Sequence, residues 1–459
     1  MNTNRSLRVL IAVFFCWALT AIGLLTLVLR YGEGLAPRTW QVLLLWTFVC
    51  TGIFILLRFF APQADLLLSA TALSVSGLSV VFLQRLDLQR FELAAALNTP
   101  APQPMALLQL LWILLGGVGA VLIVRFLSLR SVSRRPMFLG LAAVVLLLMP
   151  LLPFGLEING ARLWVRLGEI QFQPGEFGKV FFALFLGVYL SRFGLFAQFS
   201  SQRRLGFLVP PMRQFGPALA TLLLVAVILI FERDLGTALL LILLFVAVST
   251  VATARFALTA AAAGLVVIGG WLAANLFDHV ARRFEAWLSP FDSPDDAGYQ
   301  ILQSIFGLSA GGIFGEGLGS GSPNLVPFAA SDFILSVIGE EAGYAGLLAI
   351  LGIFAVLIGR ALKVALSCTG PAQQLIAFSL TSLLVIQMFL VAAGVTRVLP
   401  LTGLTTPFLS YGGSSMLACW LIVGLLLKLS NDSSSSKSPA VPVMDDATMV
   451  LGQKTQSKS

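Results

Sequence analysis

The chain has 459 residues, of which 58% are hydrophobic and 11% are charged, with a formal net charge of +8 and a mean hydropathy of +0.94. Soluble domains are roughly a quarter charged, so this composition excludes an ordinary soluble enzyme. Basic residues stand at the ends of apolar runs, where they set membrane topology, so the positive charge does not indicate nucleic-acid binding. The four cysteines lie in or beside apolar runs, at spacings that indicate neither a metal site nor a disulfide framework.

Apolar runs recur along the chain, and each is long enough to cross a bilayer as a helix. The first run continues without a cleavage pattern and is therefore predicted to remain as a helix. We expect an all-α, polytopic membrane protein with about twelve transmembrane helices. The predicted spans are Leu10–Leu29, Trp40–Arg58, Asp65–Phe82, Leu107–Arg125, Met137–Leu152, Lys179–Leu195, Pro217–Phe231, Leu235–Ala254, Ala257–Phe277, Phe333–Leu357, Gln374–Ala393 and Pro407–Lys428.

The loops between these spans differ in charge. Alternate loops are basic, as at Arg134 and Arg135, and the positive-inside rule places them and both termini in the cytoplasm. The same rule places the segment Asp278–Asp332 outside the membrane. One exception is Gln84–Pro104, which we predict to be an outer loop although it contains Arg85.

Three regions follow from these spans. Residues 1–104 hold additional N-terminal helices and a first loop, and residues 105–430 form a helical core that includes the outer loop 278–332. Residues 431–459 are rich in Ser, Lys and Pro and cannot bury a core, so we expect a disordered cytoplasmic tail.

The outer loop concentrates the ionisable residues of a chain that has few of them. It contains the only histidine, His279, together with Asp292, Asp295 and Asp296. This concentration predicts that the chemistry lies in the loop, although a long loop between membrane helices is often polar simply because it is wet. Its second half is glycine-rich, and backbone amides there could cradle a phosphate. Flexible loops are also rich in glycine, so that signal is weak alone.

Charged residues also enter the apolar runs, where they usually face a cavity or a partner. Glu176 and Lys179 are three residues apart and share one face of a helix, so they form either a structural ion pair or part of a substrate cavity. Glu340 and Glu341 lie inside the tenth span and predict a polar cavity behind the outer loop.

Five strings between Gly160 and Ser415 are distinctive. They are GARLWVRLGEIQFQPGEFGK (Gly160–Lys179), ERDLGTA (Glu232–Ala238), GYQILQS (Gly298–Ser304), SDFILSVIGEEAGYAG (Ser331–Gly346) and PLTGLTTPFLSYGGSS (Pro400–Ser415). Together they resemble the SEDS family (shape, elongation, division and sporulation), the FtsW/RodA-type cell-wall glycosyltransferases. The resemblance covers roughly Leu107 to Lys428 and is stronger to the rod-shape branch, with two extra N-terminal helices.

This resemblance implies a ten-helix core and an outer loop with a catalytic aspartate. It implies that the protein polymerises lipid II into glycan strands outside the bacterial cytoplasmic membrane, for cell elongation or division. The implied partner is a class B penicillin-binding protein, which crosslinks the strands.

The outer loop departs from the family at one position. The family has an acid immediately before a proline, in a pattern like P-W-x-D-P followed by G-Y-Q, whereas this chain reads PFDSPDDAGYQ from Pro290 to Gln300. Ser293 therefore stands where the aspartate is expected. Asp292 is the candidate catalytic residue, with Asp295 and Asp296 as alternatives, and loss of polymerase activity is a third option.

Glycan polymerisation needs a base for a sugar hydroxyl and positive charge for a pyrophosphate leaving group. A carboxylate suits the first role and arginine the second. A divalent cation, Mg²⁺ or Mn²⁺, could share the second role, although the sequence contains no dedicated ligand set. The candidate substrate-binding residues are Arg282, Arg283, Arg162, Glu176, Lys179, Gly311, Gly312, Asp332, Glu340, Ser410, Gly412 and Gly413.

Two alternatives remain open. Buried charges also suit a lipid II flippase or transporter, although the sequence contains no internal repeat. The serine at position 293 favours a non-catalytic scaffold that activates a penicillin-binding protein.

Overall fold

The computed structural model describes residues 3–32, 36–158, 160–199, 202–204, 207–209, 212–254, 264, 269–270, 275–295 and 298–436. Within these residues, nine helices are long and apolar enough to cross a membrane. A helix satisfies its own backbone groups, which is what a bilayer core demands. The nine are α1 (Thr3–Tyr31), α2 (Ala36–Phe60), α3 (Leu66–Ala96), α4 (Met105–Phe126), α8 (Met212–Glu232), α9 (Leu235–Thr253), α13 (Ile334–Ser367), α14 (Pro371–Val395) and α15 (Gly413–Ser436).

The structure confirms an all-α polytopic membrane protein. Two further helices correspond to predicted spans, namely α6 (Pro136–Leu148), which continues into η1 (Met149–Leu151), and α7 (Pro174–Phe199). The expected span Ala257–Phe277 lies largely outside the described residues, so the number twelve stays a prediction. The predicted tail begins later than expected, because α15 continues to Ser436, and the remainder of the tail lies outside the described residues.

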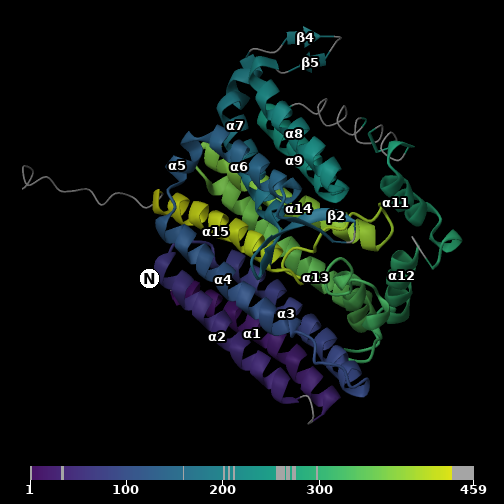
Figure 1. Ribbon diagram of the computed structural model, residues 1–459. Coiled ribbons are helices and arrows are strands. Elements are labelled where there is room, and N and C mark those ends of the chain that lie inside the picture. The colour runs from purple at the N-terminus through teal and green to yellow at the C-terminus, as the bar shows by residue number, and fades with distance from the viewer. Residues whose placement is uncertain are drawn as a thin grey trace, which may run out of the picture.

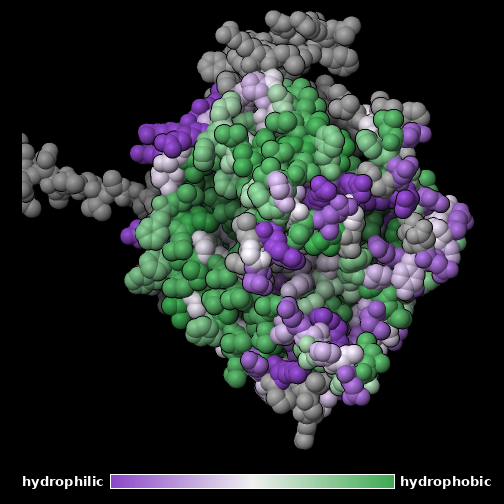
Figure 2. All heavy atoms as spheres, viewed as in Figure 1, coloured by the Kyte–Doolittle hydropathy of each residue, from purple (hydrophilic) through white to green (hydrophobic). Residues whose placement is uncertain are grey.

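The long helices lie side by side in one bundle (Figure 1). The N-terminus and the end of α15 lie at one end, near α5 (Leu129–Arg134). The other end carries α11 (Asp278–Leu288) and α12 (Tyr299–Gly311), which belong to the predicted outer loop. Figure 2 shows a broad hydrophobic surface over the long helices, and hydrophilic surface gathered at the α11–α12 end and above α5.

A small sheet that the sequence analysis did not predict stands between η1 and α7. Strands β1 (Gly155–Ile158), β2 (Ala161–Leu167) and β3 (Ile170–Phe172) pair antiparallel in the order β1-β2-β3. Its two turns contain Gly160 and Gly168, whose φ angles are +77° and +63°. Only glycine adopts such angles without strain, so these two residues allow the chain to reverse. Two further short strands, β4 (Gln202–Arg204) and β5 (Phe207–Val209), pair between α7 and α8.

Helix α3 extends well beyond its predicted end, so the expectation that Gln84–Pro104 forms an outer loop is wrong over most of its length. Arg85 is buried, and its Nε lies 2.6 Å from Oε1 of Glu341 in α13. Asp87 is also buried, and its Oδ2 accepts a hydrogen bond of 2.8 Å from the backbone amide of Ala106. Because these charges have partners inside the protein, the helix continues through them.

The glycine-rich segment after α12 lies against α13, at a kink where Gly343 has φ +66°. The amides of Glu316 and Gly317 donate to the carbonyls of Glu340 and Glu341, at 2.9 and 3.0 Å. The amide of Gly319 donates to Oε2 of Glu341 at 3.2 Å, and Arg85 donates to the carbonyl of Gly321 at 2.8 Å. The Arg85–Glu341 pair therefore holds both the helix α3 and the glycine-rich segment.

Changing Arg85 to methionine should lower the free energy of unfolding by about 3 kcal/mol, since Glu341 would stay buried without its partner. The double change Arg85→Met/Glu341→Leu should recover part of that loss because it removes both charges. Thermal or denaturant unfolding of the purified protein in detergent measures both effects. A double variant less stable than the single variant would contradict this account of the pair.

Candidate active site

The end of α11 is fixed to the loop that follows α14. Arg397, with φ +59°, donates from Nε to the carbonyl of Trp287 and from Nη2 to that of Leu288, both at 2.7 Å. In return, Nε1 of Trp287 donates to the carbonyl of Arg397 at 3.1 Å. The sequence analysis missed Arg397, whose only signal was its place in an irregular stretch between two apolar runs. These three bonds position the turn η2 (Pro290–Asp292) that follows α11.

That turn presents Asp292 and Ser293 differently. Asp292 is exposed, and its carboxylate has no hydrogen bond or ion pair with any residue that the structure describes. The hydroxyl of Ser293 is buried and has no hydrogen-bond partner within the same residues. Gly298 closes the turn, since a side chain there would meet the carbonyl oxygen of Pro290 at 2.1 Å. Of the two alternatives for Asp292, Asp295 is exposed and Asp296 lies outside the described residues.

Asp332, at the start of α13, lies close to Arg283 of α11. Nη2 of Arg283 and Oδ2 of Asp332 each lie 3.9 Å from the position that a Cβ atom would take at Gly403. Nη1 of Arg283 donates to the carbonyl of Thr402 at 3.3 Å. Burial raises the pKa of Asp332 to about 6; a hydrogen bond from Ser331 and the charge of Arg283 oppose the rise. This cluster brings together two predicted substrate-binding residues from opposite ends of the segment 278–332.

The segment Pro400–Ser415 directly contacts Ser331, near the end of the segment 278–332. The hydroxyl of Ser410 donates to the carbonyl of Ser331 at 2.5 Å and accepts from the amide of Thr406 at 2.8 Å. Gln109 of α4 donates to the carbonyl of Ser410 at 3.0 Å. Gly413 packs against the ring of Trp112, where a side chain would come within 2.6 Å. Contacts with α4 and with Ser331 therefore fix this stretch, which is non-helical up to the start of α15 at Gly413.

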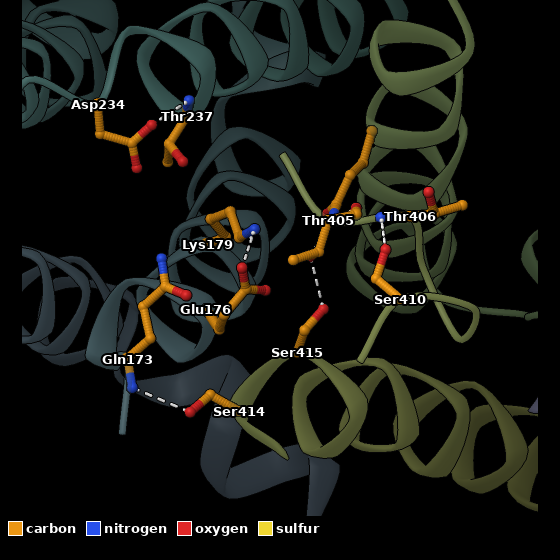
Figure 3. Close-up of polar contacts among 11 residues, drawn as sticks. Gln173, Glu176, Lys179, Asp234, Thr237, Thr405, Thr406, Ser410, Ser414 and Ser415 are labelled. Carbon is orange, nitrogen blue, oxygen red and sulfur yellow. Dashed lines mark hydrogen bonds and ion pairs between the residues drawn. The ribbon is translucent and has the colours of Figure 1, made fainter. Parts of the chain in front are cut away.

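Glu176 and Lys179 form the predicted ion pair, with Nζ and Oε1 2.9 Å apart and both side chains buried in α7. In the view of Figure 3 the pair lies between Asp234, which caps α9, and Thr405. A hydrogen bond of 2.8 Å joins Thr405 to Ser415. The amide of Gln173, just before α7, donates to the hydroxyl of Ser414 at 2.9 Å, so the start of α7 lies against the start of α15 (Figure 3).

The remaining predicted residues lie in other places. Arg282 is exposed on α11. Arg162 lines a cavity of about 300 Å³ together with Glu157, Glu232 and Arg233. Its Nε lies 3.2 Å from Glu157.

Gly311 packs against the backbone of Gly339 and Glu340, and the carbonyl of Gly312 accepts from the amide of Tyr344 at 3.0 Å. Gly412 donates weakly from its amide to Gln109 at 3.5 Å. Within the described part of the chain, no group of three or more His, Cys, Asp or Glu side chains is placed to hold a metal ion.

Comparison with known proteins identifies the class of protein that this fold and site define. A family model of the FtsW/RodA/SpoVE group, described as "Cell cycle protein", matches residues 65–435. The chain therefore belongs to this family of polytopic membrane proteins, and it is a glycosyltransferase. The match begins at the start of α3, so α1 and α2 precede it.

Two curated relatives illustrate the similarity. The chain is 41% identical over 379 residues to "Peptidoglycan glycosyltransferase RodA" of Mycobacterium tuberculosis (strain ATCC 25618 / H37Rv), covering 82% of this chain and 80% of the relative. It is 33% identical over 334 residues to "Probable peptidoglycan glycosyltransferase FtsW" of Trichlorobacter lovleyi, covering 70% and 82%.

Solved structures share the same fold. One is a chain from "Structural coordination of polymerization and crosslinking by a peptidoglycan synthase complex", with 28% identity and a TM-score of 0.63, covering 81% of this chain and 98% of that one. Another is the Thermus thermophilus Rod shape determining protein RodA, with 26% identity and a TM-score of 0.56, covering 80% and 97%.

Replacing Arg397 with lysine should slow glycan synthesis about tenfold, because an ammonium cannot bridge two carbonyls as the planar guanidinium does. The change moves the turn that carries Asp292 rather than a substrate contact, so kcat should fall more than KM rises. Val398→Ala, at an exposed neighbouring position, is the control. Equal rates for the Arg397→Lys variant and the wild type would show that these bonds do not position the turn.

The raised pKa of Asp332 predicts a pH dependence of stability. The folded state holds the proton more tightly than the unfolded state, so this group's contribution to stability is lost as pH rises from about 4 to about 6. In the Asp332→Asn variant, thermal stability should fall less steeply with pH across this range than it does in the wild type. The exposed control Asp295→Asn should keep the wild-type slope. Parallel slopes for wild type and the Asp332 variant would contradict the raised pKa.

Proposed function

We propose that this peptidoglycan glycosyltransferase polymerises lipid II, joining the C4 hydroxyl of one sugar to the anomeric carbon of another and releasing a lipid-linked pyrophosphate. Its family and its relatives named as peptidoglycan glycosyltransferases support the reaction class. The single observation that carries the assignment of its base is the exposed carboxylate of Asp292, free of contacts with other described residues.

Asp292 acts as the general base for the attacking hydroxyl in this proposal. A base must reach the hydroxyl proton of a bound substrate, and an exposed, unpaired carboxylate on a fixed turn is suited to that. Ser293 is the less suitable candidate, because its hydroxyl is buried and a serine needs a second group to accept a proton. The three hydrogen bonds between Arg397 and the end of α11 hold the turn in place.

Arg283 stabilises the pyrophosphate as it leaves. Its guanidinium lies beside Asp332 and donates to Thr402, close to the first turn of α9. A helix N-terminus favours negative charge, so both features attract phosphate. The ion pair Glu176–Lys179 shapes the cavity that receives the substrate headgroup, and the hydroxyls of Thr405 and Ser415 line its neighbourhood.

The reaction takes place at the bacterial cytoplasmic membrane in this proposal, and membership of a family of multi-span membrane proteins supports this. The loop 278–332 faces outward and both termini face the cytoplasm, as the charges of the loops predict. A class B penicillin-binding protein crosslinks the strands as they form. One structural relative comes from a complex described as coordinating polymerisation and crosslinking, which supports such a partner.

Changing Asp292 to alanine should abolish polymerisation of labelled lipid II by the purified full-length protein together with its penicillin-binding partner. Thermal stability should be unchanged because the side chain is exposed. Asp295→Ala should keep most of the activity, which makes it the matched control. The double variant Asp292→Ala/Ser293→Asp tests the neighbouring position and should recover activity if a carboxylate is needed there in either place.

Full activity of the Asp292→Ala variant would overturn the assignment of the base. Failure of the wild type itself to make glycan, with partner bound and Mg²⁺ supplied, would favour a scaffold. Movement of lipid II across vesicles without polymerisation would favour a flippase.

A further inference from the structure

A cavity of about 430 Å³ lies between the junction of α5 with α6 and the C-terminal half of α7. These segments lie at the end of the bundle away from α11 and α12 (Figure 1). Nη2 of Arg192 in α7 donates to the carbonyl of Ser133 in α5 at 2.5 Å, so the two segments that enclose it are joined. The lining residues are Arg134, Arg135, Pro136, Met137, Phe138, Tyr189 and Arg192.

Three arginines are among the residues that line the cavity. Arg134, Arg135 and Arg192 are exposed, and none of them forms an ion pair with an acidic side chain among the residues that the structure describes. No lining residue is acidic. The topology of a membrane protein explains why arginines stand at a helix end. It does not require three of them, from two separate segments, to line one cavity.

One wall of the same cavity is apolar and open. Met137 and Phe138, in the first turn of α6, are 55% and 62% exposed. They connect the cavity to the hydrophobic surface of the long helices, and Figure 2 shows hydrophilic surface above α5 beside that hydrophobic surface. A ligand that fits must carry an anionic group at one end and an apolar chain at the other.

We propose that this cavity binds an anionic phospholipid. Its phosphate pairs with the guanidinium groups of Arg134, Arg135 and Arg192, which are suited to bidentate contacts with phosphate oxygens. Its acyl chain follows Met137 and Phe138 into the membrane. Basic pockets between membrane helices are suited to lipid headgroups. The lipid would bridge α5, α6 and α7, so its binding stabilises the folded protein once its concentration exceeds the Kd.

The experiment measures thermal unfolding of the full-length protein in detergent during titration with phosphatidylglycerol. Wild type should show a saturable rise in Tm that phosphatidylcholine does not reproduce. The triple variant Arg134→Gln/Arg135→Gln/Arg192→Gln should need at least about tenfold more phosphatidylglycerol for the same rise. The charge-matched control Arg125→Gln/Arg130→Gln/Lys363→Gln changes exposed residues outside the cavity and should titrate as wild type does.

Met137→Glu provides an independent variant if the triple variant does not fold. It places a carboxylate in the exposed wall and should weaken the response by a similar factor. An equal response of wild type and both cavity variants would overturn the proposal. An equal rise with inorganic phosphate or an acidic peptide would also overturn it, because the site would then take a soluble anion rather than a lipid.

Discussion

The buried ion pair between Arg85 and Glu341 supports much of the end of the bundle that carries α11 and α12. Two charges removed from water are stable only if partners satisfy them. Here each of the two side chains also forms a second hydrogen bond. Glu341 also receives the amide of Gly319, and Arg85 also donates to the carbonyl of Gly321. A glycine-rich segment without regular structure is thereby held against two long helices. Non-helical backbone inside a membrane protein is tolerated where protein groups satisfy it, and this pair supplies several of them.

The proposed site combines fixed and open parts. Its inner part is held by direct bonds between segments far apart in sequence, such as Ser410 with Ser331 and Arg283 with Thr402. Its outer part is the exposed turn at Asp292. Such an arrangement suits a transferase whose substrate arrives from the membrane, because the base is accessible while the groups that receive the headgroup are already in place. Preorganised groups need no rearrangement at the moment of reaction.

Sequence reasoning predicted what depends on composition and local spacing. Apolar runs were enough to predict the helical membrane fold. A spacing of three residues was enough to place Glu176 and Lys179 on one helix face, where the structure pairs them. Sequence reasoning failed where distant partners decide the outcome. Helix α3 continues through Arg85 because α13 supplies Glu341, and no local pattern contains that information. Arg397 was missed for the same reason, since its three bonds connect it to residues more than a hundred positions earlier.

Gly319 lies in the region that matches the family model and contacts a helix that precedes this region. Helices α1 and α2 precede the region that matches the family, whereas Gly319 lies within it. Its φ is +90°, and a side chain there would meet Cγ of Arg30, in α1, at 2.9 Å. The N-terminal helices are therefore not an independent attachment. An exchange of α1 and α2 between relatives would have to preserve this contact with Arg30, in addition to the glycine that the φ angle itself requires.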